Sequence, residues 1–563
     1  MQQKVAHALG LSVHRVTVVC RRMGGGFGGK ESQPALFACI AALLAAKTKR
    51  PVKLRLDRDD DMIMTGKRHD FVATYDVGFD DCGQLRGVAI DLASRCGMSA
   101  DLSGPVNDRA MFHCDNCYYL PHVTITSHRC KTHTVSNTAF RGFGGPQGMM
   151  VIEYVMDEIA RDLGIDPLEV RKRNFYGIGE RDITPYQMRV EDNIIEALVT
   201  ELEMSSDYQA RRQEIEAFNA TSPVFKRGIA LTPVKFGIAF TATRLNQAGA
   251  LLHVYTDGSV QLNHGGTEMG QGLFTKVAQV AAEELQIDID RITTTATDTS
   301  KVPNASATAA SSGSDLNGKA AQAAARTIKE RLTIFAAKHF HIPPEHVVFR
   351  HNRVEMGERS IPFAELVELA YFARVSLSAT GFFRTPKIHY DRETFSGRPF
   401  LYFAYGAAVS EVIIDTLTGE YQVPRVDILH DVGNSLNPAI DRGQIEGGFL
   451  QGMGWLTTEE LWWNEEGALQ THAPSTYKIP TCRDWPADVR LSLFESGGNR
   501  EATIYRSKAV GEPPLMLAIS VFHALKDAIA SVAEAGVSPR LHAPAMPEAV
   551  LMAVEEVKGR IAQ

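Results

Sequence analysis

The stretch Arg21–Glu31, RRMGGGFGGKE, places a cluster of glycines between a β-branched run and a long apolar segment. The β-branched run predicts a strand over Arg15–Arg21, and the uncharged segment Ser32–Ala46 predicts a buried core helix. A helix that starts after a glycine-rich turn presents unpaired backbone N–H groups, which suit a phosphate. The sequence therefore predicts that this loop holds a ligand with a phosphate group.

A triphosphate-binding loop is one interpretation of this stretch. Gly24, Gly29 and Lys30 have the spacing of that motif, but the motif continues with Ser or Thr, whose hydroxyl binds magnesium. Glu31 stands at that position, and Phe27 places a ring inside the loop. A nucleotide-binding ATPase is therefore a remote alternative, and glycines that only make a tight turn are another.

Three further small-residue segments precede predicted helices. They are FRGFGGPQG (Phe140–Gly148), GGTEMGQG (Gly265–Gly272) and SATAASSGSDLNGKA (Ser306–Ala320). Four such loops are more than one phosphate requires. They suggest a large, flat, polar cofactor enclosed by backbone, with Gln271 and Gln444 as possible side-chain donors.

Composition narrows the function classes. The chain has 563 residues, a net charge of −7 and no basic block, which makes nucleic acid or an anionic membrane surface a poor partner. Hydrophobic residues make up 44% and charged residues 22%, an ordinary globular balance. The 8 cysteines and the absence of a signal-peptide pattern at the start favour free thiols and a cytoplasmic location.

The order of elements predicts an α+β (mixed α/β) fold. Hairpins are expected with turns at Asp81–Gly83, at Asp257-Gly258 and near Thr418-Gly419. Long helices are expected between them, at Met149–Leu163, Leu273–Leu285, Gly318–His339 and Leu515–Val532. The polar stretch Ser205–Arg227 predicts a boundary between two parts, residues 1–215 and 228–563, with the cofactor between the parts.

Seven segments, in chain order, carry a family resemblance: RRMGGGFGGKE, NTAFRGFGGPQG, KFGIAFT, GGTEMGQGL, VPNASATAASS, DVGNSLNPAIDRGQIEGGFLQG and SKAVGEPPL. Together they resemble the molybdenum-binding catalytic part of the xanthine oxidase and aldehyde oxidase family. One such motif would be weak evidence, whereas several in the family's order are specific. The resemblance runs from about Ala6 to the segment PAMPEAV near the end of the chain.

The resemblance implies a molybdenum–molybdopterin cofactor, with the metal held through the pterin and no covalent protein ligand. The glycine-rich loops would pack against the pterin and hold its phosphate, and the metal would lie near Phe27, Arg141 and Ala310. The residues that would line the cofactor are Gly26, Phe27, Arg141, Gln271, Ala309, Ala310, Ser311 and Gln444.

The resemblance also implies that Glu512 is the catalytic base. It would remove a proton from the oxygen that is added to an electron-poor ring carbon, while the metal takes up two electrons. Glu512 precedes two prolines and a predicted helix. Without the resemblance, it would be a carboxylate that stabilises a helix start by about 0.3–1 kcal/mol.

Residues expected at the substrate favour a purine. Arg109 would stabilise negative charge on the ring, and Glu31 would orient it by a hydrogen bond. Phe143 and Phe240 would hold the ring by face and edge, and Thr241 could add a hydrogen bond. From residue type alone, Arg109 and Glu31 would be surface charges and the two phenylalanines would be core.

The implied reaction is water-derived hydroxylation of hypoxanthine to xanthine and of xanthine to urate. An aldehyde or another N-heterocycle is the alternative substrate. Relatives that oxidise aldehydes tend to lack the glutamate and the arginine found here at Glu31 and Arg109, which favours a purine.

The electrons are expected to leave through another polypeptide. The Cys114–Cys117 pair has no second pair at metal spacing, and the clustered cysteines of iron–sulfur centres are missing from the sequence. The resemblance implies a partner chain or domain with iron–sulfur clusters and FAD that passes electrons to NAD, and an oligomer. The family's molybdenum part extends upstream of Met1, so the first part is expected to be N-terminally incomplete, in a fragment or a split-gene subunit.

Overall fold

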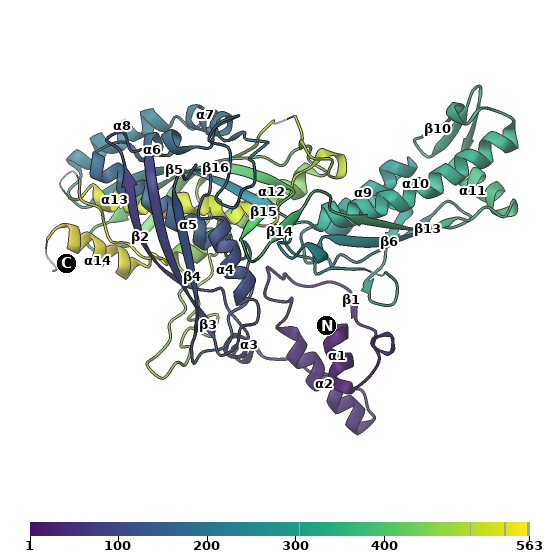
Figure 1. The fold of residues 1–563 in the computed structure, drawn as a ribbon, viewed down its shortest axis with the longest axis horizontal. Coiled ribbons are helices and arrows are strands. Elements are labelled where there is room, and N and C mark those ends of the chain that lie inside the picture. The colour runs from purple at the N-terminus through teal and green to yellow at the C-terminus, as the bar shows by residue number, and fades with distance from the viewer. Residues whose placement is uncertain (303, 496, 534–535, 560–563) are drawn as a thin grey trace.

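The computed structural model describes residues 1–302, 304–495, 497–533 and 536–559. It consists of helices and mixed sheets without a barrel, which confirms the predicted α+β class. Figure 1 shows a large body, an elongated arm of teal and green elements, and a small purple N-terminal part below them.

The body contains two sheets. The three-stranded sheet pairs β2 with β3 antiparallel and β3 with β4 in parallel. The four-stranded sheet has the order β18-β17-β16-β5, and its two long strands β16 and β5 pair antiparallel along their whole length. The strands are β2 (Phe71–Phe79), β3 (Leu85–Gly97), β4 (Val123–Lys131), β5 (Phe225–Ile238), β16 (Tyr402–Asp415), β17 (Tyr421–His430) and β18 (Asp488–Leu493).

Helices cover these sheets and supply most of two hydrophobic cores. One core joins β3 and α5 to one face of β5 and β16, and the other lies on the opposite face of these strands with α12 and α13. The helices of the body are α3 (Arg58–Met64), α4 (Ser103–Phe112), α5 (Gly145–Leu163), α6 (Pro167–Asn174), α7 (Ile195–Ser205), α8 (Tyr208–Thr221), α12 (Pro438–Thr457), the 3-10 helices η5 (Ile504–Arg506) and η6 (Pro513–Ala518), α13 (Ile519–Ala530) and α14 (Pro547–Val557).

The arm has a core of its own, in which helices α9 and α10 lie on the sheet β13-β6-β7-β8 (Figure 1). A small sheet, β10-β11-β12, and α11 complete its far end. The elements are η2 (Thr243–Leu245), β6 (Gln247–Val254), β7 (Val260–His264), α9 (Leu273–Leu285), η3 (Ile289–Arg291), β8 (Ile292–Thr294), α10 (Gly313–Phe340), η4 (Pro344–His346), β10 (Val347–Arg350), β11 (Arg353–Met356), β12 (Arg359–Pro362), α11 (Phe363–Phe372) and β13 (Ser378–Arg384). A two-stranded ribbon, β14 (His389–Asp391) and β15 (Ser396–Arg398), leads back to the body.

The predicted hairpins and long helices are confirmed. The three expected turns join β2 to β3, β6 to β7 and β16 to β17. Helices α5, α9 and α10 lie where helices are expected. The segment expected as one helix from Leu515 to Val532 begins instead as the 3-10 helix η6 and continues as α13 from Ile519.

The N-terminal part departs from the expectation for Ser32–Ala46. A helix does form there, α2 (Pro34–Thr48), and it packs on α1 (Gln2–Leu9). The expected burial is wrong: Leu36, Leu43 and Leu44 are 55%, 44% and 45% exposed, and Ala35 alone is buried. Composition predicts the helix but not whether other elements cover it.

The N-terminal part is tied to the arm by a short sheet. After the 3-10 helix η1 (Val13–Arg15), strand β1 (Val19–Cys20) pairs antiparallel with β9 (Thr297–Asp298). The loop that contains the first glycine cluster therefore starts at the arm and ends at α2 (Figure 1).

The division into residues 1–215 and 228–563 stays a prediction. In the structure, α8 spans part of the proposed boundary, and Ile215 and Ile229 belong to one core. Among the described residues, the stretch Pro513–Ala530 is long and apolar enough to cross a bilayer, but 89% of it is buried, as in a core helix.

Candidate active site

A cavity of about 540 Å³ lies where the body, the arm and the N-terminal part meet. Its size is within the range of small-molecule and cofactor sites. Every predicted site residue lines it: Gly26, Phe27, Glu31, Arg109, Arg141, Phe143, Phe240, Thr241, Gln271, Ala309, Ala310, Ser311, Gln444 and Glu512. Their chemical roles stay predictions.

The cavity wall contains non-glycine residues in the left-handed backbone region. Phe27, Phe143, Ala310 and Ser311 have φ values of 52°, 54°, 53° and 55°. Such conformations cost on the order of 1–3 kcal/mol each and gather at functional sites, where surrounding structure maintains them. Four of them on one cavity indicate a wall built for a ligand.

The first and second glycine loops cross at Gly28. A Cβ atom there would lie 2.9 Å from the backbone of Ala139 and of Phe140, and Gly28 has a φ of 99°. Only glycine allows the two backbones to approach this closely. The two loops, distant in the sequence, thus form a single wall.

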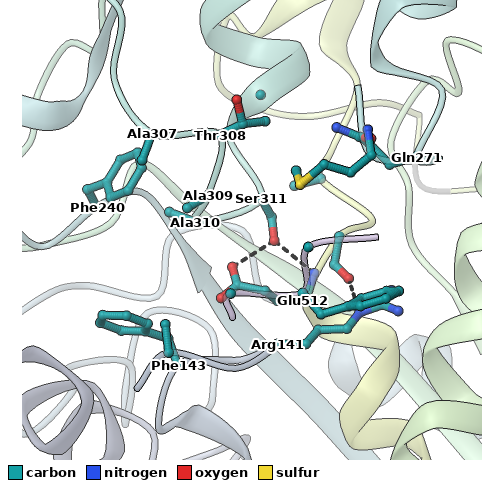
Figure 2. Close-up of a pocket in the computed structure, with 18 of the residues that line it drawn as sticks. Arg141, Phe143, Phe240, Gln271, Ala307, Thr308, Ala309, Ala310, Ser311 and Glu512 are labelled. Atoms are coloured by element: carbon teal, nitrogen blue, oxygen red, sulfur yellow. Dashed lines mark hydrogen bonds between the residues drawn. The ribbon is translucent and has the colours of Figure 1, made fainter. Parts of the chain in front are cut away.

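Glu512 is held across the junction between body and arm. Ser311 Oγ donates to Glu512 Oε2 at 2.7 Å and accepts from the Glu512 backbone N–H at 2.8 Å. Ser311 precedes α10 of the arm, whereas Glu512 precedes η6 of the body. Figure 2 shows this pair at the centre of the cavity.

Arg141 anchors the cavity floor beside Glu512. Its Nε donates to the carbonyl of Gly511, and Nη2 donates to the carbonyl of Gln444 at 3.1 Å. Burial lowers the pKa of Arg141 to about 10, so the guanidinium remains charged at neutral pH. It therefore presents a fixed positive charge and joins two of the motif segments.

Arg109 is a buried residue, so its placement as an ordinary surface arginine is wrong. It is 2% exposed, and Nη1 donates to the carbonyl of Ala239 at 3.0 Å while Nη2 donates to the carbonyl of Gly237. Nε is buried without a hydrogen-bond partner among the described residues. A buried cation held by neutral carbonyls favours an anionic group in the cavity.

Glu31 has an unusual protonation equilibrium. Burial, the Glu512 carboxylate and then Asp101 raise its pKa to about 7. At neutral pH, Glu31 is therefore present in both forms, and the neutral form can donate a hydrogen bond as well as accept one.

The two sides of Glu512 differ in character. Figure 2 shows Phe143 and Phe240 on one side of the carboxylate, with Arg141 and Gln271 on the other. A flat ring between the phenylalanines would lie next to Glu512. The side with Arg141 has the polar and small residues suited to a cofactor.

The side chain of Gln271 is already occupied within its own loop. Its Nε2 donates to the carbonyl of Thr267 at 2.9 Å, and its Oε1 accepts from the N–H of Met269 at 2.6 Å. The structure shows Gln271 shaping the loop, and its role as a donor to the cofactor stays a prediction.

Two buried ion pairs that also reach the cavity were not predicted. Lys276 pairs with Asp441, and Lys508 pairs with Asp431 at 2.6 Å. Lys276, Asp441 and Lys508 line the cavity. In the sequence, these charges look like the polar faces of helices and loops, and nothing marks them as buried.

The triphosphate-binding interpretation is not supported. Lys30, which should contact the phosphates, is exposed and does not line the cavity. Glu31, which occupies the position of the magnesium-binding hydroxyl, does line it. The Cys114–Cys117 pair is buried in the first core, and burial raises the pKa of both thiols.

The residues present fit a molybdopterin. Small-residue loops from three parts of the chain enclose the cavity, and at Gly28 a Cβ would lie 2.9 Å from the backbone of Ala139 and Phe140. Charged Arg141 and the left-handed backbone at Ala310 and Ser311 suit a flat, polar, phosphate-bearing group.

Comparison with known proteins agrees with this cavity. Two families described as "Molybdopterin cofactor-binding domain" match residues 1–175 and 201–486. The chain is 49% identical over 555 residues to xanthine dehydrogenase/oxidase of Mus musculus, and 45% identical over 562 residues to xanthine dehydrogenase 1 of Arabidopsis thaliana. Each alignment covers 98% of this chain and 40% of the relative, so the chain spans about two fifths of the length of these curated relatives.

Solved structures show the same fold. Quinoline 2-oxidoreductase from Pseudomonas putida 86 superposes with a TM-score of 0.86 at 23% identity, over 99% of this chain and 71% of that one. The aldehyde oxidoreductase from Desulfovibrio gigas gives a TM-score of 0.83 at 24% identity, over 98% and 56%. The chain belongs to the family of molybdopterin cofactor-binding domains.

Proposed function

We propose that the chain is the molybdenum-binding catalytic part of a xanthine dehydrogenase-type hydroxylase, which converts hypoxanthine to xanthine and xanthine to urate. The observation that carries the proposal is the presence of Glu31, Arg109 and Glu512 on the wall of one cavity, which Phe143 and Phe240 also line. The 45–49% identity to xanthine dehydrogenases supports the choice of a purine.

Molybdopterin would be held by Arg141, by the backbone of the glycine loops and by the turn Ala309–Ser311, all on the cavity wall. When bound, the molybdenum cofactor supplies the water-derived oxygen and takes up the two electrons of the oxidation. The protein's part is to orient the substrate, to accept a proton and to balance charge.

Glu512 accepts the proton. Its Oε2 is fixed by Ser311 Oγ, which leaves Oε1 as the atom that takes a proton from the reacting oxygen. A positioned general base contributes about 10²–10⁴-fold to a rate. The bond from Ser311 prevents the carboxylate from rotating away from the ring side of the cavity.

Arg109 and Glu31 recognise the heterocycle. The Arg109 guanidinium stabilises negative charge that develops on the purine when its ring carbon is attacked. Neutral Glu31 donates a hydrogen bond to a ring acceptor, and its ionised form accepts one from a ring N–H. An aldehyde group has one carbonyl acceptor and no N–H, so it matches only part of this pattern, whereas a purine matches all of it.

The electrons then pass to a partner chain or domain with iron–sulfur clusters and FAD, and finally to NAD. The exposed apolar side chains of α2 support a protein partner for the N-terminal part. The working enzyme is an oligomer that includes this partner.

A single-turnover assay tests the function without the electron-transfer partner. Protein loaded with molybdopterin and molybdenum is mixed anaerobically with xanthine or with an aromatic aldehyde, and product per molybdenum is measured. We expect about one urate per molybdenum and much slower aldehyde oxidation. Arg109→Leu should slow the xanthine reaction by about 10²-fold and leave the slow aldehyde reaction unchanged. Faster turnover of the aldehyde by the unmodified protein would refute the purine assignment.

A further inference from the structure

A loop at one side of the cavity, the mouth loop Phe240–Leu245, joins the end of β5 to the start of β6. Phe240, Thr241, Ala242, Arg244 and Leu245 all line the cavity. The loop is mostly irregular and ends in the short 3-10 helix η2, so backbone pairing with neighbouring strands does not fix its course.

Asn246 holds this loop from behind. Its Oδ1 accepts from the Phe240 N–H at 2.9 Å, and its Nδ2 donates to the Phe240 carbonyl at 2.8 Å and to the Thr243 carbonyl at 3.3 Å. The first two bonds pair the side-chain amide with both backbone groups of Phe240. Asn246 is 3% exposed and does not line the cavity.

Asn246 is itself fixed by two backbone hydrogen bonds. Its backbone N–H donates to Thr243 at 3.1 Å, and its carbonyl accepts from Thr385, beyond β13, at 3.0 Å. The side chain of Asn246 thus links the backbone of Phe240 to the end of β13 in the arm.

We propose that Asn246 is a positioning residue that sets substrate recognition by holding Phe240 and Thr241 at the ring side of the cavity. The effect on substrate recognition rests on the proposed function, whereas the effect on the loop does not. An amide is required because one end must accept and the other must donate. An ionised carboxylate would place a second acceptor against the Phe240 carbonyl and release the loop.

The test compares Asn246→Asp with unmodified protein and with Asn174→Asp. Asn174 is a matched control, since it is 0% exposed, accepts from Leu85 N–H and donates to the carbonyls of Gly83 and Val170. It lies at the end of α6 and outside the cavity lining. Asn246→Ala serves as a second variant, which removes the bonds without adding charge.

The first readout uses protein without cofactor. Arg244 is exposed and offers a trypsin site within the mouth loop. We expect cleavage after Arg244 to become about tenfold faster in Asn246→Asp and Asn246→Ala, but not in Asn174→Asp. Equal cleavage rates in all four proteins would overturn the inference, whatever the enzyme's activity.

The second readout is the dependence of single turnover on substrate concentration in loaded protein. We expect the half-saturating concentration of xanthine to rise about tenfold in the Asn246 variants, with the maximal rate within about threefold and the molybdenum content unchanged. Faster trypsin cleavage in the Asn246 variants together with an unchanged half-saturating concentration of xanthine would refute the role of Asn246 in recognition. Absence of purine turnover in the unmodified protein would refute the proposed function instead, and the trypsin comparison would still decide whether Asn246 holds the loop.

Discussion

Among single residues, Glu31 has the clearest expected dependence on pH. Its pKa is raised from 4.5 to about 7, so the folded protein keeps a proton that the unfolded chain releases. Relative to Glu31→Gln, the unmodified protein therefore loses stability as pH rises from about 4.5 to about 7, with no further loss above that. Urea unfolding of both proteins across this range measures the difference, and a difference that does not change with pH would contradict the burial of Glu31 beside Glu512.

Ser311 is expected to act through Glu512. Ser311→Ala removes the donor to Oε2 and the acceptor for the Glu512 N–H, so the carboxylate loses its fixed orientation. The maximal single-turnover rate should fall by about 10–10²-fold at unchanged molybdenum content. Ser312→Ala is the control, because Ser312 is a buried neighbour whose hydroxyl donates to the carbonyl of Ala309 and not to Glu512. Equal rates in the two variants would show that Ser311 does not position the base.

The sequence identifies residues that stand inside unusual motifs, such as Glu512 before two prolines and Phe27 among glycines. It does not identify Lys276 and Asp441, whose importance arises only when α9 and α12 bring them together. Burial of Arg109 was likewise not predictable, because its partners are carbonyls more than a hundred residues away along the chain.

At the scale of elements, α2 shows why an apolar composition alone does not establish burial. Its apolar residues surround the helix, and such helices are normally enclosed. The double substitution Leu43→Gln and Leu44→Gln should leave the melting temperature unchanged and reduce binding of an apolar fluorescent dye, because both side chains are already exposed. A lower melting temperature would mean that α2 is covered in solution.

Leu332 on α10 provides the matched comparison, because it is 0% exposed in the core of the arm. Leu332→Gln should destabilise the protein by about 2–5 kcal/mol, which a denaturant titration measures.

Alternation and turn residues predicted the three hairpins well, since these are local features. The strand expected at Arg15–Arg21 forms only over Val19–Cys20, where β9 supplies a pairing partner, and the 3-10 helix η6 was not predicted.

At the scale of the whole molecule, the cavity lies between three parts of the structure and belongs to none of them alone. Its wall comes from the N-terminal loop, the body and the arm, and β1–β9 pairing and the Ser311–Glu512 bonds hold these together. The four small-residue loops in the sequence suggested a common ligand. The sequence did not reveal that the arm has a hydrophobic core of its own, because that core forms by long-range packing.

Cofactor binding should therefore protect all parts of the wall together. We expect hydrogen exchange to slow in residues 24–29, 140–148, 265–272 and 306–312 when molybdopterin is added, because each segment contributes to the same cavity. Exchange in α11, far along the arm, is the internal control. Protection limited to one loop would contradict a shared site.

The most direct test of Glu512 as the base on a shared molybdopterin site is the single-turnover rate of Glu512→Gln, measured with its molybdenum content. Glutamine keeps the shape of the side chain but cannot take up the proton at neutral pH. We expect urate formation to slow by about 10²–10⁴-fold while molybdenum per chain equals that of the unmodified protein. Urate formation within about threefold of the unmodified rate, at full molybdenum content, would show that another group accepts the proton.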